Sequence, residues 1–91
     1  MELTDNERIV LTLANDITPE ELLEAVNEFF KITEDELDEI IDKLVNMGLV
    51  EVINIGKFCF FHTKQVKREM LDSNAYYYWR FGKKMDEDES K

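Results

Sequence analysis

The residues best suited to binding chemistry lie together near the C-terminal end of the chain. Residues 75–84, AYYYWRFGKK, hold four consecutive aromatic side chains and three bases. Aromatic rings stack on nucleic-acid bases while arginine and lysine pair with phosphate, so this composition suits a nucleic-acid surface. It suits a protein interface as well, because Tyr, Trp and Arg dominate the binding energy of such interfaces. Four successive aromatic residues on a helix cannot all face one core, so some must be exposed or covered by a partner.

Two sets of contacts are predicted around this segment. The candidate nucleic-acid contacts are the bases Lys57, Lys64, Lys67, Arg68, Arg80, Lys83 and Lys84. The candidate dimer interface follows one side of a helix expected from about Gln65 to Phe81, and consists of Val66, Met70, Tyr77, Tyr78 and Phe81. A homodimer through this helix is the leading expectation. Packing on the chain's own core and stacking on nucleic acid are the alternatives.

The net charge of −10 is unevenly distributed along the chain. Residues 1–56 hold fifteen acids and three bases, whereas residues 57–85 hold seven bases and two acids. Residues 86–91 are acidic again. Blocks of like charge are often only solvated faces, so this division does not by itself require a partner.

Catalysis and metal binding find no support in the residue types. Cys59 and His62 are the only cysteine and histidine, and a spacing of three residues on a strand directs them to opposite faces. The acidic run 34–39 lacks the alternating oxygen ligands and the glycine of a calcium loop. We therefore expect no enzyme activity, catalytic residue, metal, cofactor or small-molecule substrate.

The elements that must position these side chains begin with three helices. A capping box, in which a threonine and a glutamate three residues later satisfy backbone N–H groups reciprocally, occurs as Thr4–Glu7, Thr18–Glu21 and Thr33–Glu36. After each box, apolar residues return at helical spacing. Those expected to face a shared core are Ile9, Val10, Leu13, Ala14, Leu22, Leu23, Val26, Phe29, Phe30, Leu37, Ile40, Ile41, Leu44 and Val45.

A hairpin and a fourth helix are predicted to follow. Gly48 is placed to end the third helix in the left-handed conformation. The stretches 49–55 and 58–63 are rich in β-branched and aromatic residues around an Asn-Ile-Gly-Lys turn, which predicts a β-hairpin. Gly82 is the expected end of the fourth helix. We expect one domain over residues 1–85 and a disordered acidic tail over residues 86–91.

The order helix, helix, short turn, helix, Gly-Leu-Val, hairpin resembles the winged helix-turn-helix superfamily. Residues 18–63 carry the resemblance, and LDEIIDKLVNMGLVEV, residues 37–52, is similar to the superfamily's exit from the third helix into the wing. The resemblance implies an α+β fold with a three-helix core and a two-stranded wing, here extended by a C-terminal helix. It also implies that the third helix is the one that DNA-binding members place in the major groove.

The predicted outward face of this third helix is unusual for a DNA-binding member. It consists of Asp35, Glu39, Asp42, Lys43 and Asn46, which is three acids to one base. Duplex binding depends on neutralising phosphates, so three carboxylates would be repelled from the groove. We therefore expect this acidic face to dock a protein partner, in a non-enzymatic module of transcription or other nucleic-acid-handling machinery.

Two other functions remain open. The first is a dimeric transcriptional regulator that contacts DNA through the wing and the basic C-terminal helix. The second is a phage or mobile-element inhibitor that presents its carboxylates as a mimic of DNA. In every case we expect generic duplex DNA to bind weakly. The chain starts without a secretory signal and has no apolar run of about 20 residues, so we expect a cytoplasmic protein that does not enter the membrane.

Overall fold

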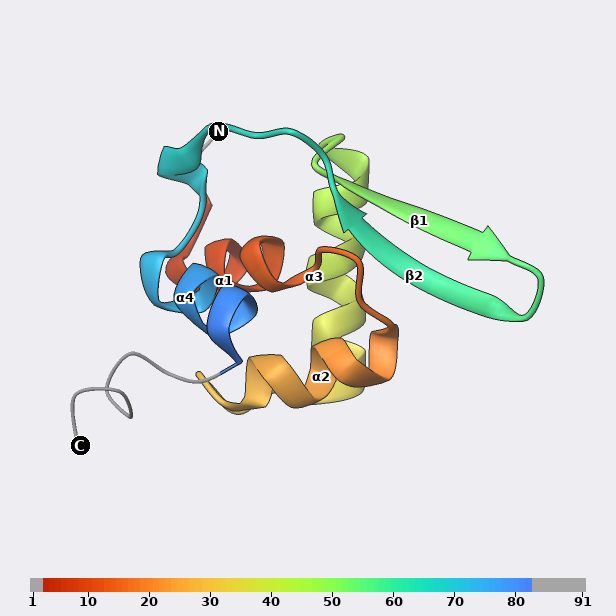
Figure 1. Cartoon of the computed structure of the whole chain (residues 1–91), viewed down its shortest axis with the longest axis horizontal. Coiled ribbons are helices and arrows are strands. Elements are labelled where there is room, and N and C mark those ends of the chain that lie inside the picture. Colours follow the sequence, from red (N-terminus) through yellow and green to blue (C-terminus); the bar gives the residue numbers. More distant parts are fainter. Residues whose placement is uncertain (1–2, 83–91) are drawn as a thin grey trace.

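The computed structural model describes residues 3–82, which form helices around a core and a projecting hairpin (Figure 1). The elements are α1 (Asp5–Leu13), α2 (Pro19–Asn27), α3 (Glu34–Asn46), β1 (Val50–Ile55), β2 (Phe58–Thr63), a 3₁₀ turn (Arg68–Met70) and α4 (Ser73–Phe81). Within these residues, four α-helices and a two-stranded antiparallel sheet make an α+β fold. The arrangement is compatible with a winged helix.

All three predicted capping boxes are confirmed. The Thr4 hydroxyl accepts a hydrogen bond from the Glu7 backbone N–H at 3.1 Å, and the Thr4 N–H donates to the Glu7 carboxylate at 2.9 Å. Thr18 with Glu21, and Thr33 with Glu36, repeat the arrangement. Hydrogen bonds from Thr33 hold the pKa of Glu36 below its ordinary value. The starts of α1, α2 and α3 therefore follow from local sequence alone.

The core lies where α1, α2 and α3 meet the base of the hairpin. The predicted residues that are buried there are Val10, Leu13, Ala14, Leu22, Val26, Leu37, Ile41 and Leu44. The other predicted core residues are half-buried against it: Ile9, Leu23, Phe29, Phe30, Ile40 and Val45. Leu11 is fully buried although the pattern did not predict it. The reason is that α1 contacts α2, α3 and α4, so it is covered on more than one side.

The second helix ends at Asn27, before the two phenylalanines that its apolar pattern included. The Asn27 side-chain amide donates to the Leu23 carbonyl at 2.8 Å, and its oxygen accepts from the Ile32 N–H at 3.3 Å. These bonds close the turn between α2 and α3 with side-chain groups in place of a further helical turn. Phe29 and Phe30 consequently lie in that turn.

The hairpin projects away from the helices and is attached to them at its base (Figure 1). Its register pairs Val50 with Thr63 at the base and Ile55 with Phe58 at the tip. Gly56 has φ +60° at the first position of the two-residue loop, where glycine is favoured. A single antiparallel bridge, Ile17 to Phe61, joins β2 to the connection between α1 and α2. The predicted hairpin is confirmed to within one residue at its start.

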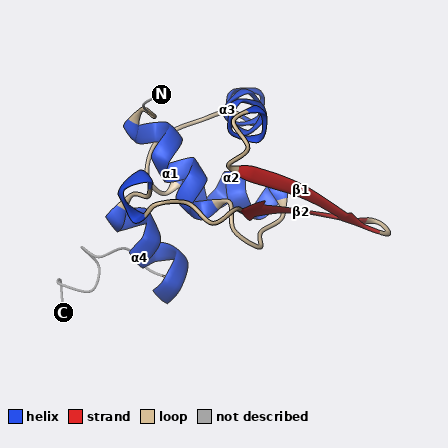
Figure 2. Cartoon of the chain, turned by 90° about the horizontal axis from the view of Figure 1, so that it is seen from above, coloured by secondary structure: helices blue, strands red, loops and turns tan. Residues whose placement is uncertain are grey.

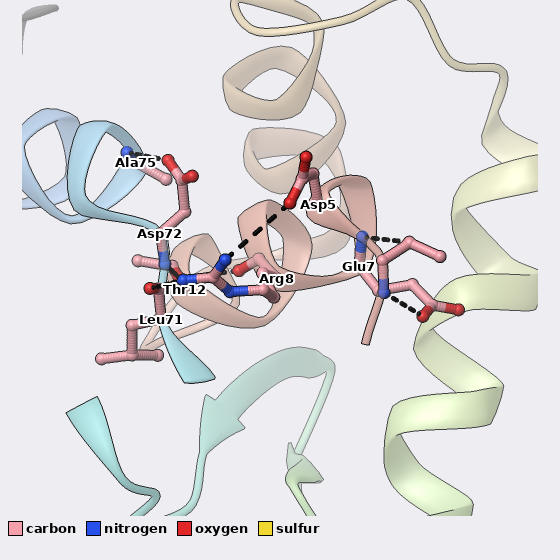
Figure 3. Close-up of polar contacts among 8 residues, drawn as sticks. Asp5, Glu7, Arg8, Thr12, Leu71, Asp72 and Ala75 are labelled. Carbon is pink, nitrogen blue, oxygen red and sulfur yellow. Dashed lines mark hydrogen bonds and ion pairs between the residues drawn. The ribbon is translucent and has the colours of Figure 1, made fainter. Parts of the chain in front are cut away.

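The last helix begins later than predicted. The sequence suggested a helix from about Gln65, but α4 starts at Ser73 after the 3₁₀ turn. The Asp72 carboxylate accepts from the Ala75 N–H at 2.9 Å and so fixes the start (Figure 3). The Asp72 N–H in turn donates to the Thr12 hydroxyl of α1 at 2.9 Å. A local cap and a tertiary contact with Thr12 thus act together at this boundary, whereas Gly82 ends the helix in the left-handed conformation as predicted.

Candidate docking surfaces

The outer face of α3 is acidic and exposed. Asp35, Glu39, Asp42 and Asn46 are all exposed, on the side of the helix opposite the buried Leu37, Ile41 and Leu44. Figure 2 shows α3 at one side of the molecule, with α4 on the other side of α1. The predicted orientation of this face is therefore what the structure shows. The carboxylates of Asp35, Glu39 and Asp42 are therefore accessible to a binding partner.

The only base on α3 is directed to the neighbouring helix. Lys43 Nζ donates to Oε2 of Glu7 in α1 at 2.6 Å. Among residues 3–82, Glu7 is the one charged residue that is buried, at 8% exposure, and its other oxygen is occupied by the α1 capping box. The bonds from Lys43 and Thr4 lower the Glu7 pKa more than burial raises it. Lys43 is thus exposed as predicted, with 43% of its side chain accessible, while its ammonium is balanced by Glu7 of α1.

The hairpin carries little accessible positive charge. Lys57 lies at the exposed turn, and Lys64, just after β2, forms an ion pair with Glu51 of β1 at 3.6 Å. Between them the surface is apolar: Ile55 is 63% exposed and Phe58 is 65% exposed. These apolar side chains carry no positive charge and no hydrogen-bond donor for a phosphate group. They are better suited to contact with apolar groups.

The two faces of the hairpin differ in what covers them. Phe61 lies on one face and lines a hollow beside α2 and α3, where it is buried. Successive side chains of a strand point to opposite faces, so Phe60, with its partner Ile53, is turned away from those helices. Phe58 shares that outer face and stacks on Phe60, with ring centroids 6.2 Å apart. His62 also lies there and meets the Asp16 carboxylate at 3.0 Å.

Three of the five predicted dimer-interface residues pack on their own chain. Val66, Met70 and Tyr78 are half-buried against the core. The Tyr78 ring meets Phe29 edge-on, with centroids 5.5 Å apart. The aromatic run is thus divided as the helical geometry requires, with Tyr78 turned inward. Trp79, on another side, donates through its indole N–H to the Asn15 carbonyl at 3.2 Å.

The remaining two, Tyr77 and Phe81, border a hollow of about 340 Å³ beside the start of α4. Arg68 and Arg80, which the sequence suggested as nucleic-acid contacts, line the same hollow. Residues assigned to two separate surfaces are therefore brought together in one. The rest of the lining is Leu71, Asp72, Ser73 and Tyr76.

The other predicted bases do not join this hollow. Lys67 is exposed next to Arg68 but is not part of the lining. Lys83, Lys84 and the predicted tail 86–91 lie outside the described residues. Four lining residues were not predicted as site residues: Leu71, Asp72, Ser73 and Tyr76. An aspartate is a common helix N-cap, so Asp72 could have indicated the start of α4.

No protein-family model, curated protein or solved structure matches this chain. Over residues 3–82, no helix has the length and apolar character needed to cross a membrane. In the same range, no three His, Cys, Asp or Glu side chains gather at a spacing that would hold a metal ion. The surfaces described above must therefore carry the functional argument.

Proposed function

We propose that this chain is a winged-helix module that works by docking the acidic face of α3 onto a protein partner. The observation that carries the proposal is the Lys43–Glu7 ion pair at 2.6 Å. Lys43, the only base of α3, is exposed, but its ammonium is paired with Glu7 of α1, so the outer face presents Asp35, Glu39 and Asp42 with their charge not balanced by Lys43. A partner that offers lysine or arginine side chains complements such a face.

The assignment to the winged-helix class rests on the order and placement of the elements. Three capped helices precede a hairpin that projects from the body, and α3 is exposed along one side (Figures 1 and 2). The resemblance of residues 18–63 to the winged helix-turn-helix superfamily points to the same class. It also suggests a setting in transcription or other nucleic-acid-handling machinery, where members of this superfamily act.

Direct reading of duplex DNA is the less favoured function. A helix in the major groove passes between two rows of phosphates, and three exposed carboxylates raise the energy of that position. The wing offers Lys57 at its tip, but Ile55 and Phe58 beside it are exposed apolar groups. Apolar exposure next to an acidic helix favours a protein surface over a polyanion.

The test is affinity capture with charge-reversed variants. The chain with Glu39→Lys and Asp42→Lys is compared with the native chain and with a control that carries Glu24→Lys and Glu28→Lys. Both control positions are exposed and belong to α2 and its C-terminal cap, so the control has the same net charge but keeps the α3 face. Each bound protein is then purified and titrated against all three chains.

The expected result is a partner that binds the native chain and the control alike and is lost by the α3 variant. The proposal fails if every partner is retained by the α3 variant, or if both variants lose binding equally. A partner that proves to be a nucleic-acid enzyme, bound through its substrate channel and displaced by duplex DNA, would instead identify the chain as a mimic of DNA.

A further inference from the structure

We propose that the hollow beside α4 is a second docking site, which binds a short acidic peptide segment carrying an aromatic or aliphatic side chain next to its carboxylates. The site consists of Arg68, Asp72, Tyr76, Tyr77, Arg80 and Phe81. Helix α4, which supplies most of the lining, lies on the other side of α1 from α3 (Figure 2). The inference therefore stands apart from the proposed function and can be tested separately.

Two guanidinium groups provide the positive charge of the site. Arg68 comes from the 3₁₀ turn and lies over the Tyr76 ring, 5.9 Å from its centroid. Arg80 comes from α4 and lies over the Phe81 ring at the same distance. The four ion pairs formed among residues 3–82 involve neither arginine. Both are exposed, so their donors are open to a carboxylate from outside.

The one carboxylate in the lining, that of Asp72, is hydrogen-bonded within the protein. Asp72 is half-buried and caps α4 through its bond to the Ala75 N–H at 2.9 Å. Two arginines and one aspartate leave the site with a net positive charge. Guanidinium groups bind carboxylates in a two-bonded, planar geometry that lysine cannot reproduce. The chemistry of the site thus selects an anionic ligand, a carboxylate or a phosphate.

The aromatic rings that line the hollow indicate that the ligand also carries an apolar side chain. Phe81 is 57% exposed although it borders the hollow, and the rings of Tyr77 and Phe81 lie 4.6 Å apart, centroid to centroid. A volume of about 340 Å³ is at the small end of the range for binding pockets, and suits one or two side chains. An aromatic or aliphatic side chain would cover the exposed ring and exclude water from the ion pairs, which strengthens them.

The position of the site is fixed by contacts between α1 and the segment before α4 (Figure 3). Arg8 donates through Nη2 to the Leu71 carbonyl at 2.7 Å, and Thr12 accepts from the Asp72 N–H. Ala75, in the first turn of α4, is fully buried. These contacts hold the start of α4 against the core, so the lining does not have to be assembled when a ligand arrives.

An acidic peptide fits better than a nucleic acid because of the charge of the whole chain. A strand of nucleic acid brings a phosphate at every nucleotide, and the protein that it approaches has a net charge of −10. A short acidic peptide brings only a few carboxylates, of which one or two interact within the hollow. Repulsion from acids farther away than the Debye length, about 8 Å at physiological ionic strength, is largely screened.

The experiment is fluorescence anisotropy on the full chain with three labelled probes. The first probe is the peptide Gly-Asp-Glu-Phe-Asp-Glu, the second replaces its Phe by Ser, and the third is an oligothymidylate of about ten nucleotides. The test variant carries Arg68→Gln and Arg80→Gln. The control carries Lys31→Gln and Lys57→Gln, two exposed bases outside the hollow, and so has the same net charge. Light scattering on the same samples gives the mass.

We expect the first peptide to bind the native chain and the control within about twofold of one another. Its affinity should fall at least about tenfold in the arginine variant, and also when its Phe is replaced by Ser. Absence of peptide binding to the native chain, or equal losses in variant and control, overturns the proposal. Tighter binding of the oligonucleotide overturns it in favour of nucleic acid. A dimer that the arginine variant dissociates overturns it in favour of a second copy of this chain.

Discussion

Lys43 of α3 and Glu7 of α1 form a partly buried ion pair between the two helices, with 2.6 Å between Nζ and Oε2. Glu7 is nearly buried, and the same carboxylate caps α1 through the Thr4 N–H. One glutamate therefore completes the start of one helix and neutralises the only base of another. The pair couples the stability of the fold to the charge of the α3 surface, because it balances the Lys43 ammonium with Glu7 while the lysine side chain stays 43% exposed.

Replacing Lys43 by methionine should destabilise the fold and reduce its dependence on pH. The nearly buried Glu7 carboxylate would lose its counter-charge, at a cost of about 1–3 kcal/mol. Glu7 has a lowered pKa in the native chain, so its ionised form stabilises the fold above its ordinary pKa of 4.5. That contribution is lost as the pH falls through the lowered folded value. Urea unfolding at several pH values measures the effect.

The matched control for this experiment is Lys31→Met, which removes an exposed lysine from the turn before α3. The control should leave both the stability near pH 7 and its loss in acid close to native. Equal destabilisation of the two variants would show that Lys43 acts only through the net charge. A Lys43→Met chain with native stability and an unchanged acid transition would contradict the role given to the pair.

Replacing Thr12 by valine should loosen α4 from the core. Thr12 is buried, donates to the Arg8 carbonyl at 2.7 Å and accepts from the Asp72 N–H at 2.9 Å. Valine keeps the shape but leaves that N–H unpaired, which costs about 1–3 kcal/mol. Amide hydrogen exchange should accelerate first at Ala75 and its neighbours. Serine at position 12 should restore protection, and failure of serine to do so would point to packing instead of the hydroxyl.

Substitutions two residues apart on α3 should differ widely in cost. Asp42 is exposed, so Asp42→Ala should change the free energy of unfolding by no more than about 0.5 kcal/mol. Leu44 is fully buried, so Leu44→Ala should cost about 2–5 kcal/mol. Thermal or urea denaturation of the two variants measures this. A greater loss at position 42 would mean that the helix is oriented differently from the structure.

The wing should show the same contrast along one strand. Phe61 is buried at the base, at 7% exposure, so Phe61→Ala should cost about 3–5 kcal/mol. Phe58 is exposed at the tip and contacts Phe60, so Phe58→Ala should cost about 1 kcal/mol or less. The smaller residue should also reduce binding of a hydrophobic dye. Equal costs at the two positions would indicate that the tip is covered by another part of the molecule.

The features that the sequence predicted correctly are those set by local rules. Each capping box joins residues three apart, and the hairpin turn depends on Gly56 and its immediate neighbours. Residues close together in the sequence were therefore enough to predict these features. The orientation of α3 followed from the spacing of Leu37, Ile41 and Leu44. The exposed acidic residues of the candidate site were predictable for the same reason.

What could not be predicted depends on contacts between distant residues. Lys43 and Glu7 are far apart in the sequence, so the pattern on α3 placed Lys43 correctly among the exposed residues but did not show its ion pair with Glu7. The start of α4 depends on Thr12, and the burial of Leu11 depends on helices packed on several sides of α1. The hollow near α4 combines Arg68 from the 3₁₀ turn with Arg80 and Phe81 from the helix, and no spacing in the sequence shows that they meet.

The most direct test of the proposed docking role of α3 is a titration of mixed-sequence duplex DNA, followed by anisotropy, at low salt and at an ionic strength of about 0.15 M. The native chain and a variant with Lys57→Glu, Lys64→Glu and Lys67→Glu are measured side by side. We predict micromolar or weaker binding of the native chain at the higher ionic strength, and further loss in the variant. Tight duplex binding that survives all three substitutions would contradict the account, because the acidic face of α3 would then lie against DNA.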